Sequence, residues 1–424
     1  MDALPAPSSG PAAPGPSTLL NQPIVIDNGT HSVRAGYAGG SSPRHVVPSL
    51  VGRAKHVRVM PGGALEDEEG TSVGRSAADR SVGGGGKIYV GRRAADHRGA
   101  MILKRPMDRG AVADGGWEDM ERLWEHVFSR ENLHTPASEH PLLLTEVPFA
   151  PQLHRDRSAE ILFETMRVPA LHHAIPAVLS LYASGRTTGV VLDVGHGCAH
   201  AVPVYEGHAL PHSAVRTDVA GGDVAEMVRT VLRRSAGYHM GTSAEAELAG
   251  EIAESTCSVS LTALGGAGGW GRGRSLPFLD DAGPYEPYVL PDGNAVQLTN
   301  RDRQLPAEVL FDPSLMGSEE MSVSQCLLSS VSRSDVDLRS VLLENVVLAG
   351  GSTLLPGFGA RCLADLRASG PPHARIRISA PPERVNSAWI GGSILASLAT
   401  FKNVWVTRAE WEEAGSSVWQ RRGL

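Results

Sequence analysis

The sequence has little that would place it in a membrane, in an oxidising compartment or on nucleic acid. No apolar run approaches the ~18 residues of a membrane-spanning helix, and no basic flank precedes an apolar core at the N-terminus. The four cysteines, Cys198, Cys257, Cys326 and Cys362, lie far apart without a CxxC pair, so we expect reduced thiols. A formal net charge of -7 gives no electrostatic reason to expect a nucleic-acid partner. These absences predict a soluble intracellular protein without membrane insertion.

The length of 424 residues allows a sizeable core and about two or three domains. Residues 1–22 are rich in Pro, Ala and Ser and cannot bury enough apolar surface to offset their ordering entropy, so we predict a disordered tail. Residues 67–87 have no periodic apolar face and end in glycines, which predicts a flexible insertion in a loop. The Gly-rich segment 265–273 predicts a linker.

Two stretches of similar design predict β-hairpins with an acid at the tip. In the first, the apolar β-branched run at residues 24–26 leads into Asp27. In the second, residues 190–192 lead into Asp193, and residues 199–205 form the returning strand. One Asp-Gly turn alone is usually only a turn. Two such hairpins in order predict an internal duplication whose halves face each other across a cleft.

The tips of these hairpins carry residue types suited to binding phosphate. Glycines such as Gly195 and Gly197 let backbone N–H groups approach phosphate oxygens, and an aspartate at the end of a strand can hold a divalent cation through its water shell. Arg34 lies on the returning strand of the first hairpin, where its cation could reach a phosphate. It could equally be an ordinary solvated strand residue.

The rest of the chain predicts alternating strands and helices, which favours α/β layers over a pure barrel. We expect short strands over 46–60 broken at Pro48 and Gly52, a strand at 88–90, a helix capped by Asp114 with an apolar stripe from Trp117 to Phe128, a strand within 140–148, a helix at 155–165, a loop and then a helix over 169–183, helices at 224–234 and 245–256, and a turn followed by a helix over 380–398.

A third informative stretch follows the strand predicted at residues 346–349. The pair Gly350 and Gly351 comes next, and Ser352 or Thr353 could cap the helix after it. A strand-to-helix glycine turn suits close backbone approach to a nucleotide. It is equally suited to tight packing, and the residues alone leave both interpretations open.

Taken in order, these segments resemble the actin family. The resemblance rests on IVIDNGTHSVRAGYAG, SLYASGRTTGVVLDVGHGCAHAVPVYEGHALPHS, VVLAGGSTLLPGFG and SAPPERVNSAWIGGSILASL, and it covers nearly everything from residue 23 onward. Within the family, VGRAKHVRVMPGGALE, DHRG, LPHS and TFKNVWVTRAEWEE are more similar to the actin-related proteins of dynactin than to conventional actin.

The resemblance implies an actin-like ATPase fold of the α/β class. Such a fold has two lobes with duplicated RNase H-like cores and two smaller inserted subdomains, and the lobes close on ATP or ADP with Mg2+. It implies a small lobe of residues 23–177 and 386–424 and a large lobe of residues 178–385.

The resemblance also implies a set of nucleotide-binding positions. They are Asp27, Gly29, Thr30 and Arg34 in the first phosphate loop, Asp193, Gly195, Gly197 and His200 in the second, and Glu254, Gly350, Gly351 and Ser352 beside the adenosine. Asp27 and Asp193 would be the metal-binding residues.

Several positions depart from the family pattern. His196 replaces an acid, and an imidazole is a poor substitute for a carboxylate around Mg2+. Pro176 replaces a glutamine that orients the attacking water, a loss worth on the order of 10²-fold in rate. His31 crowds the first loop, and Gly250, Ala253 and Val385 stand where basic side chains are usual. No catalytic set is intact although His200 is retained. We therefore predict that ATP or ADP with Mg2+ is bound weakly or not at all, with negligible hydrolysis.

These features favour a cytoplasmic, cytoskeletal filament subunit of a dynactin-like complex that supports motor transport on microtubules. Its expected partners are copies of itself or other actin-related subunits, together with dynactin and dynein components. The alternative is a dynamically polymerising ATPase like conventional actin. A lesser alternative is a nuclear actin-related protein of a chromatin complex.

Overall fold

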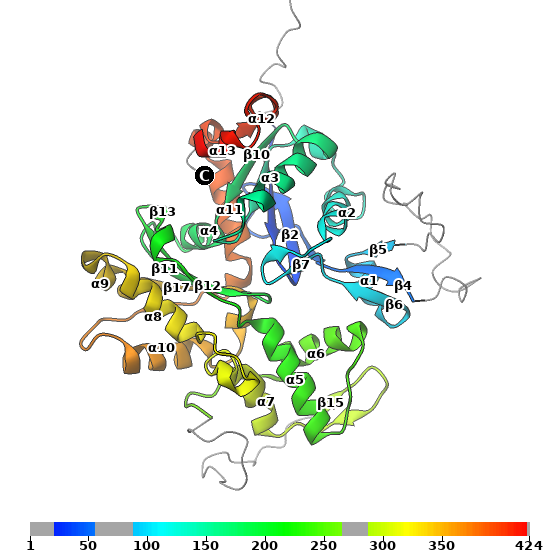
Figure 1. The fold of residues 1–424 in the computed structure, drawn as a ribbon, viewed down its shortest axis with the longest axis vertical. Helices are drawn as coiled ribbons and strands as arrows, with labels where there is room; N and C mark the ends of the chain where they lie inside the picture. Colours follow the sequence, from blue (N-terminus) through cyan, green and yellow to red (C-terminus); the bar gives the residue numbers. More distant parts are fainter. Residues whose placement is uncertain (1–20, 56–87, 265–286, 422–424) are drawn as a thin grey trace, which may run out of the picture.

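The computed structural model describes residues 21–55, 88–264 and 287–421. Two large β-sheets with helices around them dominate these residues (Figure 1). Almost all of the predicted tail, the insertion at 67–87 and the linker at 265–273 lie outside the described residues. No helix within the described ranges combines the length and the apolar character that crossing a bilayer requires.

The first sheet has the strand order β19-β10-β9-β1-β2-β3. An antiparallel meander forms β1 (Ile24–Asn28), β2 (Ser32–Tyr37) and β3 (His45–Pro48). On the other side of β1, β9 (Leu142–Thr145) and β10 (Ala170–Ala174) add in parallel, and β19 (Val406–Thr407) closes the edge in the antiparallel sense.

The second sheet repeats this plan. The antiparallel part consists of β11 (Gly189–Val194), β12 (Ala199–Tyr205) and the short strands β13 (His208–Ala209) and β14 (Val215–Thr217), which both pair with β12. On the other side of β11, β17 (Val346–Ala349) and β18 (Ile378–Ser379) add in parallel. Two sheets with one topology are a duplicated RNase H-like core, so the predicted α/β fold class and its two acid-tipped hairpins are confirmed.

The central strands are buried on both faces, as is usual where helices cover a parallel sheet on each side. Side chains alternate between the faces. Ile24 and Ile26 pack in one cluster with Trp124 of α2 (Trp117–Phe128), whereas Val25 packs on the opposite face with Trp389 of α11 (Ser387–Ser397).

One helix, α4 (Pro176–Ala183), packs against both sheets. Its Leu179 belongs to the cluster under the first sheet, while Leu181 belongs to the cluster under the second. Helix α11 crosses α4 closely. A Cβ added at Gly391 would lie only 1.8 Å from the carbonyl oxygen of Leu179, so the two backbones are nearly in contact. Gly391 therefore permits backbone contact between these two helices.

The strands of each large sheet come from separate parts of the chain. All strands of the first lie within residues 23–177 and 386–424, and all strands of the second lie within 178–385. This separation agrees with the two predicted lobes, whose boundaries remain a prediction.

The other elements surround these two sheets. The helices are α1 (Arg92–Asp96), α3 (Gln152–Glu160) with the π-helical turn η5 (Ile161–Thr165), α5 (Gly221–Ser235), α6 (Ser243–Thr256), α7 (Asn300–Glu308), α8 (Val323–Arg333), α9 (Val336–Glu344), α10 (Phe358–Ser369), α12 (Arg408–Ala414) and α13 (Ser417–Arg421). Small sheets are formed by β4 (Val51–Ala54), β5 (Ile88–Val90) and β6 (Met101–Lys104), by β7 (Met107–Asp108) with β8 (Ala111–Val112), and by β15 (Tyr288–Val289) with β16 (Ala295–Val296).

Three local predictions are wrong. Gly52 does not break a strand but pairs with Leu103 inside β4, where a Cβ would lie 2.7 Å from a methionine sulfur. The segment predicted as a loop after residue 169 begins with β10, which is buried between β9 and β19. Helix α2 begins after Gly116, and no side chain caps it, so Asp114 is not its cap.

The predicted cap at Ser352 or Thr353 is also wrong. The next α-helix, α10, starts only after Gly357, and the intervening turn η8 (Gly351–Leu354) has no side-chain cap. The two hydroxyls donate elsewhere, from Ser352 to the carbonyl of Gly195 and from Thr353 to the carbonyl of Gly350, each at 2.7 Å. The four cysteines are free and buried, as expected.

Candidate functional site

A cavity of about 820 Å³ lies between the two sheets, at the tips of both hairpins. Its volume is in the range of small-molecule sites, roughly 300–1,000 Å³. All of the positions named as nucleotide-binding from the sequence line it, namely Asp27, Gly29, Thr30, Arg34, Asp193, Gly195, Gly197, His200, Glu254, Gly350, Gly351 and Ser352. Their individual roles remain predictions, but the fold brings all of them to one place.

Asp27 lies near the end of β1, beside the end of the parallel strand β9. Thr145 of β9 donates a hydrogen bond from Oγ1 to Asp27 Oδ1 at 2.9 Å, and Arg34 Nη1 lies 3.6 Å from Oδ2. Burial raises the pKa of Asp27, while Arg34 and Thr145 oppose that rise. Arg34 also donates from Nε to Asn386 Oδ1 at 3.0 Å, so its guanidinium is fixed at the cavity wall rather than solvated.

Asp193 occupies the matching position on β11, opposite His200 of β12. His200 Nε2 lies 3.6 Å from Asp193 Oδ2 and has no hydrogen-bond partner among the described residues. Burial lowers the pKa of His200 and Asp193 opposes the effect. Repulsion from Asp193 also raises the pKa of Asp27.

The glycines allow the two hairpins to pack against each other. A Cβ at Gly197 would lie 2.6 Å from Thr30 Oγ1, so the two tips touch. Gly350 has φ +85, and a Cβ there would lie 2.4 Å from Asp193 Oδ1 and 2.3 Å from the carbonyl oxygen of Val194. Only glycine fits this position. The tight-packing interpretation of Gly350 is therefore correct, and the same residue lines the cavity.

Two histidines stand in the cavity where the family pattern has a glycine and an acid. The rings of His31 and His196 lie with their centroids 5.3 Å apart. Burial and the neighbouring Arg105 lower the pKa of His31 to about 4 and that of His196 to about 3, so both rings are neutral at pH 7. No group of three or more metal-ligating side chains occurs in the described part of the chain.

Pro176, the first residue of α4, also lines the cavity. Its ring has no hydrogen-bonding atom, so it cannot orient a water molecule there. Gly250, Ala253 and Val385 line the cavity as well, and none of them supplies a charge.

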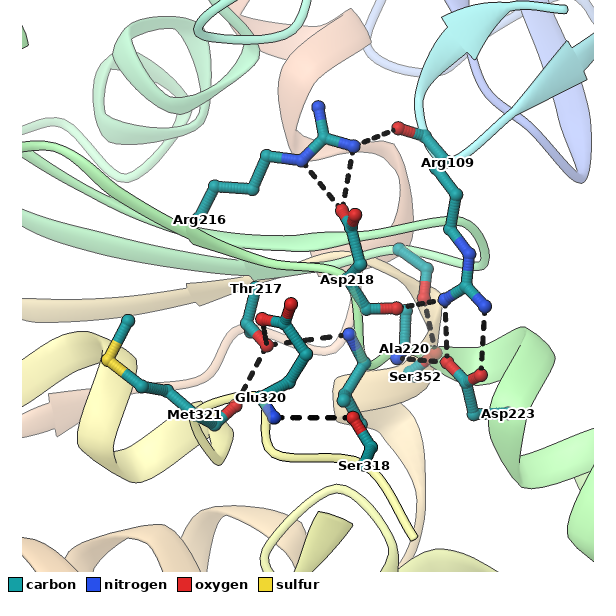
Figure 2. A network of polar contacts seen from close by, with 12 residues as sticks. Arg109, Arg216, Thr217, Asp218, Ala220, Asp223, Ser318, Glu320, Met321 and Ser352 are labelled. Atoms are coloured by element: carbon teal, nitrogen blue, oxygen red, sulfur yellow. Dashed lines mark hydrogen bonds and ion pairs between the residues drawn. The ribbon is translucent and has the colours of Figure 1, made fainter. Parts of the chain in front are cut away.

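Sequence reasoning missed a polar network that joins the two halves beside the cavity (Figure 2). Arg109, in the turn between β7 and β8, donates to both carboxylate oxygens of Asp223 in α5, at 3.0 and 3.2 Å, and to the carbonyl of Asp218. Arg216 of β14 donates to the carbonyl of Arg109 at 2.6 Å and to Asp218 Oδ1 at 2.8 Å. Arg109 lies more than a hundred residues before its partners in the chain, so no local pattern could have revealed the network.

The lower part of the same network ties β14 to the segment before α8. Thr217 donates from Oγ1 to the carbonyl of Met321 at 2.8 Å, and the backbone N–H of Glu320 donates to Ser318 Oγ at 3.2 Å (Figure 2). Strand β14 is thereby held from both sides.

A comparison with known protein families identifies the chain. The family model described as Actin matches residues 18–424. The chain belongs to the actin family. A similar curated protein is the "Actin-like protein" of Neurospora crassa, which is 46% identical over 397 residues, covering 93% of this chain and 97% of that protein. Members of the actin family form filaments of actin-like subunits and typically bind ATP or ADP with Mg2+.

The residues in this actin-family cleft suit ATP or ADP with Mg2+ in part. Mg2+ is usually held by one or two carboxylates together with waters and phosphate oxygens. Asp27 and Asp193 supply two carboxylates, and Arg34 supplies a cation beside them. The neutral ring of His196 adds no third carboxylate. The residues present thus match a metal–nucleotide ligand in part, with fewer anionic groups beside the two aspartates than the family pattern provides.

Proposed function

We propose that this actin-family chain is a subunit of a short, stable cytoskeletal filament of the dynactin kind, with a nucleotide site that binds weakly and hydrolyses negligibly. The observation that carries the proposal is the placement of Pro176 and His196 in the cavity wall. A filament of fixed length has little need of rapid nucleotide turnover, so loss of the hydrolytic groups is compatible with such a role.

In the proposed site, Asp27 and Asp193 would hold Mg2+, and Arg34 would supply a cation for a phosphate. When bound, Mg2+ would neutralise charge on the phosphates. The turns at Gly29 and Gly195 bring backbone close to the same region. His200 keeps its buried place beside Asp193, but Pro176 gives a nearby water no orienting partner.

Phosphate release from purified, ATP-loaded protein tests the catalytic half of the proposal. We expect a rate at least ~100-fold below that of conventional actin, because removal of a water-orienting group alone costs about that factor. The variant Pro176→Gln with His196→Asp should raise the rate, and His196→Asp alone should raise affinity in the presence of Mg2+. Release by the unmodified chain at the rate of conventional actin would show that the proposal is wrong.

The partner assignment rests on the segments that resemble the dynactin branch, centractin above all. We propose that the chain assembles with itself or with other actin-related subunits, together with dynactin and dynein components, in the cytoplasm. Mass spectrometry of the native complex, purified through a tag on the full chain, tests this. Dynactin and dynein subunits are the expected result. Subunits of a chromatin-remodelling complex would instead support the nuclear alternative.

A second candidate is a dynamically polymerising ATPase. The retained Asp27, Asp193 and His200, which the fold brings together in one cavity, favour it. ATP-dependent pelleting of the purified chain without any partner would support this candidate. Assembly that does not depend on ATP would count against it.

A further inference from the structure

Helix α6 presents a row of carboxylates to the opposite side of the cleft mouth. Glu247, Glu251 and Glu254 are spaced four and three residues apart, which places them on one face of the helix. Two of them pair with an arginine from the other side: Glu247 Oε2 is 2.6 Å from Arg105 Nη2, and Glu251 Oε2 is 3.2 Å from Arg98 Nη2. Glu254 Oε1 lies 4.0 Å from Nε2 of the neutral His31 ring. At the start of α6, Ser243 Oγ accepts from the backbone N–H of Leu103 at 3.1 Å. The row therefore holds α6 against β6 and its flanking segments (Figure 1).

Arg105 differs from Arg98 because it also binds the turn of the first hairpin. Its Nη1 donates to the carbonyl oxygens of Thr30 at 3.0 Å and of His31 at 2.9 Å. Its Nη2 donates to Glu247 and lies 3.3 Å from His31 Nδ1. The side chains of Arg105 and Glu247 are only 17% and 19% exposed, so these charge-assisted bonds are weakly screened by solvent.

One guanidinium thus joins the hairpin turn that lines the phosphate end of the cavity to the helix that lines its mouth. We propose that Arg105 is a positioning residue that couples closure of the cleft mouth to the backbone of the turn at residues 29–32, and thereby slows release of a bound nucleotide. The nucleotide part of this proposal rests on the proposed function above.

The physical reason is a shared donor. Without the guanidinium, two carbonyl oxygens of the turn and the carboxylate of Glu247 lose the same partner, so the hydrogen bonds that link the turn to α6 are lost. Loss of one hydrogen bond to a charged group changes an equilibrium or a rate by about 10- to 100-fold.

The pair Arg98 and Glu251 provides a matched control. It spans the same mouth from the same helix face, but neither residue lines the cavity, and neither is bonded to the turn at 29–32. Arg98→Gln therefore removes a bridge across the mouth while leaving the turn untouched. Arg105→Gln removes both the bridge and the hold on the turn.

The test measures release of etheno-ADP with Mg2+ from the full-length chain. We expect Arg105→Gln to speed release by on the order of 10-fold and Arg98→Gln by less than about 2-fold. Glu247→Gln should have part of the effect of Arg105→Gln, and the double variant should be no faster than Arg105→Gln alone. Arg105→Lys keeps the charge but loses the forked donor, so it should rescue only partly.

Hydrogen exchange of the ligand-free protein gives a readout that needs no nucleotide. Arg105→Gln should raise amide exchange both at residues 29–32 and in α6, whereas Arg98→Gln should raise it in α6 alone. If the unmodified chain binds no etheno-ADP, the nucleotide part of the proposed function fails, and exchange still decides whether Arg105 couples the two segments. Equal effects of Arg105→Gln and Arg98→Gln on exchange would overturn the coupling. Circular dichroism shows whether each variant is folded, so an effect on coupling can be told apart from unfolding. Arg105→Lys is the mildest change in the series.

Discussion

The close crossing of α4 and α11 makes a strong prediction for the substitution Gly391→Ala. The added Cβ would lie 1.8 Å from the carbonyl oxygen of Leu179, about 1.6 Å short of the ordinary contact distance of 3.4 Å. The obstacle is backbone, so no side-chain rotation can relieve it and the two helices must move apart. Overpacking of this kind costs typically about 1–3 kcal/mol, against a gain of about 1 kcal/mol for Ala over Gly in a helix. We expect a net loss of about 2 kcal/mol, since the clash is severe.

Gly250 offers the opposite case within α6. It lies inside the helix, and a Cβ there would meet nothing within 4 Å. Gly250→Ala should therefore stabilise the ligand-free protein by about 0.5–1 kcal/mol through helix propensity and a less flexible unfolded chain. The same chemical change is thus expected to have opposite signs at two helical positions.

Urea unfolding of the two variants, followed by circular dichroism, measures both free energies. The midpoint should fall for Gly391→Ala and rise for Gly250→Ala. If Gly391→Ala unfolds at or above the midpoint of the unmodified chain, the argument that these two helices cross at backbone contact is refuted.

Three further predictions concern acid stability, a buried ion pair and the metal. Burial holds the pKa of His172 at about 4, below its ordinary 6.5, so the unfolded state gains the proton first and stability falls by about 3 kcal/mol between pH 6.5 and pH 4. His172→Phe should flatten the pH dependence of the urea midpoint in that range. Arg361→Leu leaves Glu308 buried and unpaired and should cost about 3–5 kcal/mol of unfolding free energy, whereas Arg157→Ala at an exposed pair should change it by less than about 0.5 kcal/mol. Asp27→Asn should remove most of the Mg2+ dependence of etheno-ADP binding in a titration, and unchanged Mg2+ dependence would contradict the metal assignment.

The two hairpins could be predicted because their signal is local. An apolar β-branched run that ends at Asp27 or Asp193, followed by glycines, specifies a strand and a turn within about ten residues. The positions of the site follow once two such hairpins are placed face to face. The strand at residues 170–174 was missed for the opposite reason, because its two histidines, His172 and His173, are polar residues that the fold buries between β9 and the C-terminal segment.

Contacts between distant segments could not be predicted. Arg105 reaches Glu247 and Arg109 reaches Asp223, each across more than a hundred residues, and a single arginine in a sequence gives no indication of its partner. The helix cap predicted at Ser352 is wrong for a related reason. Ser352 could cap a helix locally, but its hydroxyl instead donates to the carbonyl of Gly195, a partner that only the assembled cleft provides.

The route of the chain has a consequence for biosynthesis. The second sheet is complete once residue 379 has been synthesised, but the first sheet receives β19 only at residues 406–407, and its cores include Trp389, Trp405 and Trp419. On the ribosome, the N-terminal strands must therefore wait with apolar faces uncovered until residue 419 has been synthesised, a state prone to aggregation. We expect nascent chains that stop before residue 386 to need a holding chaperone, although residues 178–385 can already have folded.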